Sequence, residues 1–254
     1  MISETTSRGT QQKIFKNDRI YKFNHFGYED IAEVLVSRLE AFVCGIDYID
    51  YNFDCIDNKP VCYSNSFKLP GCQEITLYRL LNYFEDFSAL KMSCSGKEYM
   101  NLIEDRVFQL TGLNIHGYLA KIIMLDSITL NEDRHLNNIS VRRMEKGGFE
   151  VMPIYDNGMS LLADIKRYPL SIGYNFQVGM VKARPFDDSF KQQVELFQDA
   201  GLLKIDIEAF YKDLTEAEAG WYRFFDGRSQ MYERAKGVLL SQLERMEGIS
   251  WVRR

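Results

Sequence analysis

Three side chains suited to phosphate chemistry stand in two short stretches in the middle of the chain. Asp133 and Asn138 are five positions apart, and Asp156 follows 18 residues after Asn138 and two residues before Gly158. Transfer of a phosphoryl group from ATP needs a group that orients and deprotonates the attacking hydroxyl, and oxygen ligands that hold Mg²⁺ on the phosphates. Each stretch alone is typical of a turn, but together, at this spacing, they indicate a phosphotransferase.

The two stretches also resemble a known family of kinases. The run Asp-Arg-His-x-x-Asn at 133–138 resembles the catalytic loop of phosphatidylinositol kinases and of HipA-like bacterial Ser/Thr kinases, including the CtkA-like branch. Tyr-Asp-Asn-Gly at 155–158 stands where those kinases carry Asp-Phe-Gly. The resemblance covers most of residues 5–200 and is tightest at 126–160. The eukaryotic Ala-Pro-Glu triplet is missing, which leaves the protein substrate undefined.

The resemblance implies a fold, an activity and cofactors. The expected fold is α+β and bilobal, with a small β-rich N-lobe containing one helix (1–67) and a larger, mainly helical C-lobe (68–254). The expected activity is ATP- and Mg-dependent phosphorylation of a Ser or Thr hydroxyl in a protein, itself included. Asp133 would be the catalytic base or orient the acceptor hydroxyl, and Asn138 and Asp156 would bind the metal. There are two alternatives. One is a lipid or small-molecule kinase, and the other is a pseudokinase that acts as a binding module of a toxin–antitoxin pair.

Two elements must hold these residues in place. An apolar helix over 115–130 is expected to lead directly into the catalytic loop, and a hairpin of two strands, 139–143 and 149–154, should present Asp156 at its end. Gly158 would let the backbone bend away. We expect Arg134 and His135 to have structural roles, with the histidine packed inward against the loop and Asp156.

The resemblance to kinases also assigns roles in ATP binding to two charged residues of the N-lobe. Lys22, on a strand over 19–23, is expected to hold the ATP phosphates, with Lys13 and Lys16 as alternatives. A helix over 27–43 should provide the glutamate that pairs with this lysine. Glu33 is preferred because it lies mid-helix against the apolar stripe, whereas Glu29, near the helix start, is the alternative and would favour the helix dipole.

The nucleotide site is completed by two further segments. Gly9 lies in a stretch that suits a phosphate-covering hairpin, although a frayed N-terminus ahead of the first strand fits it equally well. Two strands, over 48–56 and 60–67, should lead into a hinge between the lobes. There Ser64, Ser66 and Phe67 are expected to line the adenine site.

Helical patterns fill the rest of the chain. Helices are expected over 75–87, from a cap at Ser95 to Gly112, and over the three closing segments 189–200, 207–214 and 229–247, which should complete the C-lobe. Ser160 and Ser171 are the serines considered for autophosphorylation, and ordinary loop serines are the favoured interpretation.

Composition limits the functional classes. The formal net charge of −5 gives no basis for direct nucleic-acid binding, and five cysteines without a Cys-x-x-Cys pair are typical of reduced thiols. No apolar run approaches the length of a membrane span. We therefore expect a cytoplasmic protein, with delivery to another cell by a leaderless route left open. The expected partners are a protein substrate and an antitoxin or other regulatory protein.

Overall fold

Two hairpins with the same turn chemistry build the first sheet. Asn17-Asp18 and Asp57-Asn58 each join two strands through a two-residue loop, and all four residues have φ angles between 50° and 60°. Asn and Asp tolerate this left-handed conformation, which matches the twist of a tight hairpin. The sheet is antiparallel, in the order β1-β2-β4-β3, and its strands are β1 (Lys13–Lys16), β2 (Arg19–Phe23), β3 (Asn52–Ile56) and β4 (Lys59–Asn65).

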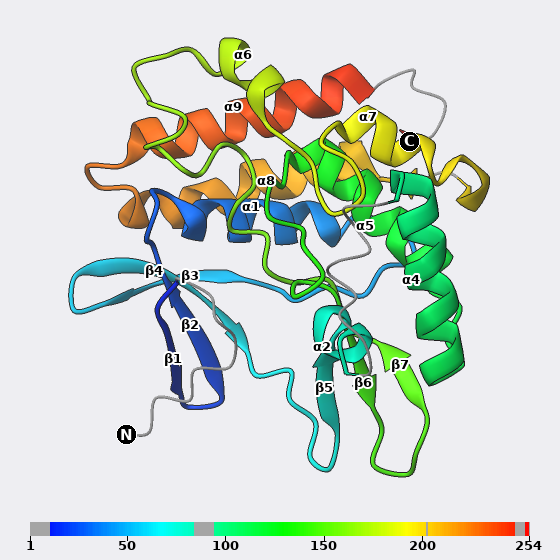
Figure 1. Cartoon of the computed structure of the whole chain (residues 1–254). Helices are drawn as coiled ribbons and strands as arrows, with labels where there is room; N and C mark the ends of the chain where they lie inside the picture. Colours follow the sequence, from blue (N-terminus) through cyan, green and yellow to red (C-terminus); the bar gives the residue numbers. More distant parts are fainter. Residues whose placement is uncertain (1–10, 84–93, 202, 247–251, 254) are drawn as a thin grey trace.

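The chain as a whole is a mixed α+β fold, as predicted. In the computed structural model, which describes residues 11–83, 94–201, 203–246 and 252–253, the antiparallel sheet forms the N-terminal part and helices dominate the C-terminal part (Figure 1). Gly9 lies outside the described residues. The proposed boundary after residue 67 falls in the connection between β4 and β5 (Gln73–Thr76), and the division into two lobes at this point stays a prediction.

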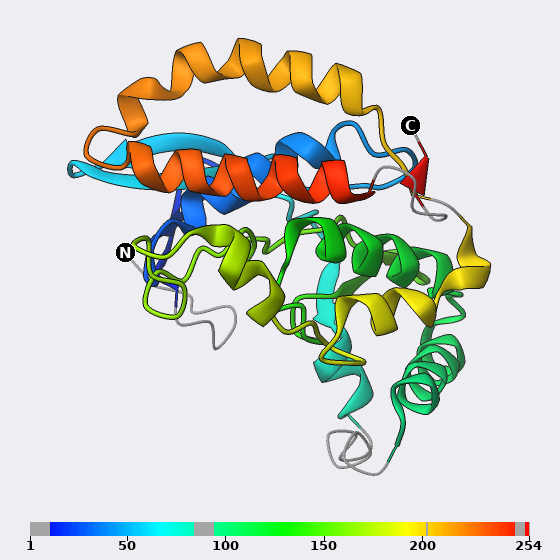
Figure 2. The same cartoon turned by 90° about the horizontal axis from the view of Figure 1, so that it is seen from above.

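Helix α1 (Glu29–Glu40) is buried on almost every face. Arg38 is its only residue outside the buried set, because helices cover α1 from the side opposite the sheet. These helices are α8 (Ile207–Trp221) and α9 (Ser229–Met246), and α9 also contacts α5 (His116–Thr129) (Figures 1 and 2). The closing helices were expected to complete the C-lobe. They also enclose the helix of the N-terminal part.

The segment at 73–76 corrects one prediction. A helix was expected over 75–87, of which 84–87 lie outside the described residues. In the described part, β5 pairs with β6 (Ser140–Arg143), which pairs in turn with β7 (Phe149–Val151). The reason is Thr76, whose hydroxyl accepts from the backbone N–H of Arg79 and caps the short helix α2 (Leu77–Leu81). An N-cap residue is extended, so the chain before it can join a sheet.

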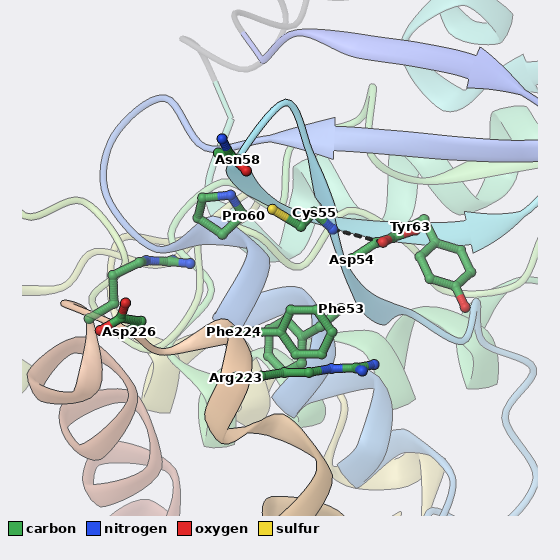
Figure 3. A pocket seen from close by; sticks show the side chains of 10 residues that line it. Phe53, Asp54, Cys55, Asn58, Pro60, Tyr63, Arg223, Phe224 and Asp226 are labelled. Atoms are coloured by element: carbon green, nitrogen blue, oxygen red, sulfur yellow. Dashed lines mark hydrogen bonds between the residues drawn. The ribbon is translucent and has the colours of Figure 1, made fainter.

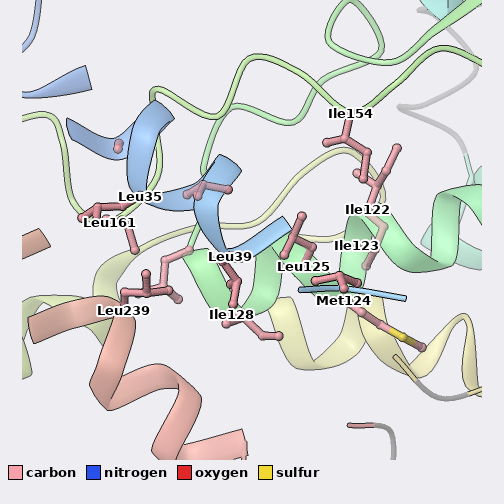
Figure 4. Close-up of a cluster of buried hydrophobic side chains, with 14 of the residues drawn as sticks. Leu35, Leu39, Ile122, Ile123, Met124, Leu125, Ile128, Ile154, Leu161 and Leu239 are labelled. Atoms are coloured by element: carbon pink, nitrogen blue, oxygen red, sulfur yellow. The ribbon is translucent and has the colours of Figure 1, made fainter. Parts of the chain in front are cut away.

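The helices leading to the catalytic loop agree with the sequence. Helix α4 (Gly96–Thr111) begins with a Ser95–Glu98 capping box and ends at Gly112 in the left-handed conformation. Helix α5 is apolar around its circumference and its residues from Leu119 onward are largely buried. It contributes Ile122, Ile123, Leu125 and Ile128 to a core that also holds Leu35 and Leu39 of α1 and Leu239 of α9 (Figure 4).

The segment before Asp156 is tied to the N-terminal part of the chain. Strand β3 starts at Asn52 rather than at the predicted Tyr48, which instead forms an isolated parallel bridge with Ile154. The backbone N–H of Ile154 donates to Asp47 at 2.7 Å, and that of Ile49 donates to Ile154 at 2.9 Å. This short pairing fixes the backbone two residues ahead of Asp156.

Short elements complete the C-terminal part. The predicted helix over 189–200 is divided by a turn, and the helix predicted over 207–214 continues to Trp221. No helix in the described part of the chain is both long and apolar enough to cross a membrane. The remaining elements are α6 (Tyr174–Gln177), the 3-10 helix η1 (Val178–Met180), α7 (Phe190–Glu195), η2 (Gln198–Ala200), β8 (Leu203–Lys204), η3 (Tyr222–Phe224) and β9 (Val252–Arg253).

A buried ion pair holds the start of α9 on the start of α1. Arg228 donates to both carboxylate oxygens of Asp30, at 2.5 and 2.8 Å, and Asp30 is fully buried. Removing one partner leaves an uncompensated buried charge, so we expect Arg228→Ala to lower the free energy of unfolding by about 3 kcal/mol. Urea denaturation measures this, with Arg223→Ala, an exposed arginine nearby, as control. A loss below about 1 kcal/mol would contradict it.

Candidate active site

Lys22 joins three separate parts of the chain in a cluster in which Lys22 and Glu33 are buried and Asp156 is partly exposed. Its Nζ donates to Oε1 of Glu33 on α1 and, at 2.8 Å, to Oδ1 of Asp156 in the loop after β7. Lys22 is 4% exposed and lies over the ring of Tyr51, 4.6 Å from its centroid. Burial works to lower the pKa of Lys22, but the charges of Asp156 and Glu33 outweigh it and raise that pKa well above its usual value. The ammonium is therefore charged.

The structure separates the two candidate glutamates. Glu33 pairs with Lys22, and its second oxygen accepts from the backbone N–H of Asn157 at 2.9 Å. Glu29 instead accepts from the backbone N–H groups of the three residues before Tyr28, at 2.6 to 2.8 Å. It therefore closes the start of α1, and Glu33 is the glutamate that faces the lysine.

Asp156 is held as a carboxylate in an unusual backbone conformation. Its φ angle is 62°, in the left-handed region that few non-glycine residues adopt. Burial favours its neutral form, but the charges of Lys22 and Lys13 prevail and keep the pKa of Asp156 well below its usual value. The Lys13 Nζ lies 4.0 Å from Asp156 Oδ2, whereas Lys16 is exposed at the end of β1.

Gly158 has a different role from the one predicted. The backbone changes direction at Asp156, and Gly158 is absent from the residues with positive φ in the described chain. A Cβ at position 158 would lie 3.2 Å from the Cβ of Glu29 and 3.4 Å from Oε1 of Glu33. The glycine is needed because the loop passes close to α1.

Asp133 lies in the loop after α5, with its carboxylate between His135 and Arg184. The charge of Asp156 adds to burial in raising the pKa of Asp133, against the opposing effects of His135 and Arg184. Oδ2 of Asp133 is 3.7 Å from His135 Nε2, and Oδ1 is 3.4 Å from Arg184 Nη1. The side chain is 38% exposed, so this carboxylate is accessible from outside.

Asn138 closes the loop that Asp133 opens. Its Nδ2 donates to the backbone carbonyl of Asp133 at 2.9 Å, and its own backbone N–H donates to His135 at 2.8 Å. The amide orientation leaves Oδ1 without a hydrogen-bond donor among the described residues. The bond from Nδ2 thus fixes this amide against the backbone of Asp133.

Arg134, not His135, is the residue that braces the loop. Arg134 is fully buried, and its guanidinium binds both oxygens of Asp126 on α5 at 2.9 and 3.0 Å. It also donates to the backbone carbonyl of Tyr155 at 2.7 Å and to Oδ1 of Asn157 at 2.6 Å. The side chain of His135 is 39% exposed. Its Nδ1 is nevertheless buried, so the histidine packs inward only in part, and the longer arginine fills the interior and reaches more acceptors.

The residues predicted to line the adenine site are dispersed around the connection between the sheets. Phe67 stacks on Tyr155 with ring centroids 6.1 Å apart, directly beside Asp156, and its carbonyl accepts from Arg142 at 2.8 Å. Ser64 is buried within β4, and Ser66 is exposed. Of these three residues, Phe67 is the one that lies near Asp156, because it stacks on the adjacent Tyr155.

A separate surface hollow lies elsewhere. It has a volume of about 620 Å³ and opens between the β3–β4 hairpin and the turn before α9 (Figure 3). Its walls include Phe53 and Phe224, whose rings stack at 5.6 Å, and Arg223 above Phe224. None of the predicted site residues lines it.

Comparison with known proteins places the fold. No protein-family model matches the sequence, and no curated protein matches it either. The Helicobacter pylori proinflammatory kinase CtkA is similar over 95% of this chain and 88% of its own, with a TM-score of 0.63 and 16% identity. The chain has the HipA/CtkA kinase-like fold.

A second solved structure with the HipA/CtkA fold supports the same conclusion. HipA of Shewanella oneidensis MR-1, in the complex of a HipA–HipB toxin–antitoxin system with its operator DNA, is similar over 93% of this chain with a TM-score of 0.54 and 16% identity. The chain spans 64% of the length of that HipA. The resemblance seen in the sequence thus extends over nearly the whole fold.

Sequence reasoning missed three contributors to this site of the HipA/CtkA fold. Asn157 links Arg134 to the buried Glu40, to which its Nδ2 donates at 3.0 Å, and Arg184 reaches Asp133 from a distant segment. Asn157 carries a local signal, since an amide beside Asp156 can both donate and accept. Neither Glu40 nor Arg184 carries one, because each meets the site only through tertiary contacts.

Proposed function

We propose that this protein is an ATP- and Mg-dependent kinase that phosphorylates Ser or Thr hydroxyls of a protein. The observation that carries the proposal is the meeting of Lys22, Glu33 and Asp156 in one cluster, from segments up to 134 residues apart. The fold shared with the kinase CtkA supports it. A lysine paired with a helix glutamate and facing a metal-binding aspartate is the arrangement that protein kinases require for phosphoryl transfer.

Lys22 would bind the nucleotide phosphates by exchanging one partner. Its ion pair with Glu33 fixes the ammonium. Its contact with Asp156 pairs a cation that would bind the phosphates with a carboxylate that would bind the metal. With nucleotide bound, the lysine would donate to phosphate oxygens and the carboxylate of Asp156 would bind the metal. Glu33 keeps the ammonium in place during this exchange.

The donor set fits Mg²⁺. This ion prefers oxygen ligands and is held through one or two carboxylates together with substrate phosphates. Asp156 would provide a carboxylate whose pKa is depressed, and Asn138 would provide an amide oxygen from the loop that carries Asp133. When bound, the metal would neutralise charge on the phosphates, and the two side chains would hold it there.

Asp133 would act on the acceptor. Its carboxylate is partly exposed and lies between His135 and Arg184, so it can accept a hydrogen bond from an incoming hydroxyl. The raised pKa of this group favours proton uptake during the transfer. Positioning of the hydroxyl is its main contribution in this proposal.

The direct test is incubation of the purified protein with Mg-ATP, followed by mass spectrometry and measurement of ADP release. We expect incorporation of phosphate into the protein itself or into added protein acceptors, and none with EDTA. Lipid vesicles serve as a parallel acceptor. Transfer only to lipid would favour the lipid-kinase alternative, and nucleotide binding without any transfer would favour a binding module.

The HipA likeness also supports a protein partner. That HipA is in a complex with HipB and operator DNA, and the sequence resemblance predicts an antitoxin or regulatory protein for this chain. The partner would be a protein rather than nucleic acid, because the chain is acidic overall.

The two glutamates of α1 give a paired prediction. Glu33→Gln should lower kcat/KM for ATP roughly tenfold to a hundredfold, because a hydrogen bond to a charged group contributes about 1.5–3 kcal/mol. Glu29→Gln should leave ATP kinetics unchanged and lower the melting temperature, since the N-terminus of α1 loses charge-assisted hydrogen bonds. Steady-state kinetics and thermal unfolding of both variants distinguish the roles. Equal effects on ATP kinetics would contradict the assignment.

A further inference from the structure

Arg184 reaches the proposed catalytic carboxylate from a part of the chain that the kinase motifs do not include. It lies between η1 and α7, and its Nη1 is 3.4 Å from Oδ1 of Asp133, 51 residues earlier in the sequence. The guanidinium is 52% exposed. A partly exposed cation is thus placed on the accessible carboxylate of Asp133.

The backbone around Arg184 is held without help from its side chain. Gln193 is fully buried; its Nε2 donates to the carbonyl of Arg184 at 2.9 Å and its Oε1 accepts from the N–H of Phe186 at 2.8 Å. Ala183 donates to the carbonyl of Asp188 at 2.8 Å. The loop therefore presents the guanidinium from a fixed position.

Stability does not explain the placement of this arginine. An ion pair between two groups as exposed as Arg184 and Asp133 contributes little to folding. A guanidinium has five N–H donors in a planar fork, and Asp133 is its one partner among the described residues. The remaining donors are free to bind an oxyanion next to Asp133.

We propose that Arg184 is a catalytic residue that binds the phosphoryl group during transfer, which rests on the kinase function proposed above. The acceptor oxygen forms a bond to the γ-phosphorus while its proton passes to Asp133. The bond from that phosphorus to the β,γ-bridging oxygen breaks, and ADP leaves with the electron pair. Arg184 donates to the oxygens of the transferring phosphoryl group, where negative charge must be neutralised.

The proposal predicts how Arg184 variants bind a mimic of the transferred group. The probes are Mg-ADP alone and Mg-ADP with aluminium fluoride, which occupies the position of the phosphoryl group, measured by isothermal calorimetry. Arg184→Ala should bind Mg-ADP within threefold of the wild type. Its affinity for Mg-ADP with aluminium fluoride should fall at least thirtyfold, and Arg184→Lys should recover part of that affinity. Lys182→Ala, which removes an exposed lysine two residues away, should match the wild type with both probes.

These measurements separate the failure of each proposal. If Arg184→Ala binds the aluminium fluoride complex as tightly as the wild type does, the role of Arg184 is refuted while the kinase proposal stands. If the wild type binds neither probe, both proposals fall. Thermal unfolding of each variant, expected to be unchanged, shows that the loop remains folded; addition of guanidinium to Arg184→Ala should restore part of the lost affinity.

Discussion

Asp156→Asn is expected to reduce phosphate transfer on the order of a thousandfold, because the site loses the charge that holds the metal on the phosphates. Asparagine keeps the size of the side chain and tolerates the φ of 62° at this position. Lys22 keeps its ion pair with Glu33, so the cluster should remain folded. ATP consumption at saturating Mg-ATP and thermal unfolding with and without Mg-ATP measure the two effects.

A matched variant controls for the substitution itself. Asp54 on β3 accepts a hydrogen bond from the backbone N–H of Cys55 at 2.8 Å and lies outside the site. Asp54→Asn should leave phosphate transfer unchanged. An Asp156→Asn protein that transfers phosphate at the wild-type rate would remove Asp156 from the metal site and with it the proposed reaction.

The part of the site that could be predicted is encoded locally. The order of Asp133, Asn138 and Asp156 depends on short spacings, and in the structure Arg134 joins the loop of Asp133 to the carbonyl of Tyr155, next to Asp156. Helix α1 was recognisable from its apolar period, and the position of Glu33 within that period identified it as the inward glutamate. Residues separated by few positions on a regular element have their relative directions fixed by geometry.

The part that could not be predicted depends on distant contacts. The exposure of His135 and the burial of Arg134 follow from which side chain finds Asp126 and Asn157 in the folded interior. Strand β5 was hidden because Ile75 also fits a helical period, and only pairing with β6 determines its conformation. Arg184 reaches Asp133 through the tertiary fold alone.

Arg134 connects the parts of the site that the chain brings from different elements. Through one guanidinium it binds Asp126 on α5 and the loop at 155–157, and Asn157 in turn contacts Glu33 and Glu40 on α1. Burial raises the pKa of Glu40, which accepts from the amide of Asn157, well above its usual value. The relative positions of α1, the loop at 133–138 and the loop at 155–157 therefore depend on a few buried polar contacts.

Arg134→Met is accordingly expected to lower the free energy of unfolding by about 3–5 kcal/mol, because it leaves Asp126 buried without its cation and Asn157 without a donor. Burial already favours the neutral form of Asp126, so protonation would relieve only part of the cost. Urea denaturation gives the value. Arg143→Met, at an exposed position on β6, should change stability by less than about 0.5 kcal/mol.

The double variant Arg134→Met/Asp126→Leu separates stability from positioning. Replacing both buried charges by apolar groups removes the uncompensated carboxylate, so the double variant should be more stable than Arg134→Met alone. Phosphate transfer should stay low in both, since neither holds the carbonyl of Tyr155 or the amide of Asn157 in place. Recovery of activity together with stability would show that the arginine only balances the charge of Asp126; recovery of stability alone would show that it positions the loop that carries Asp156.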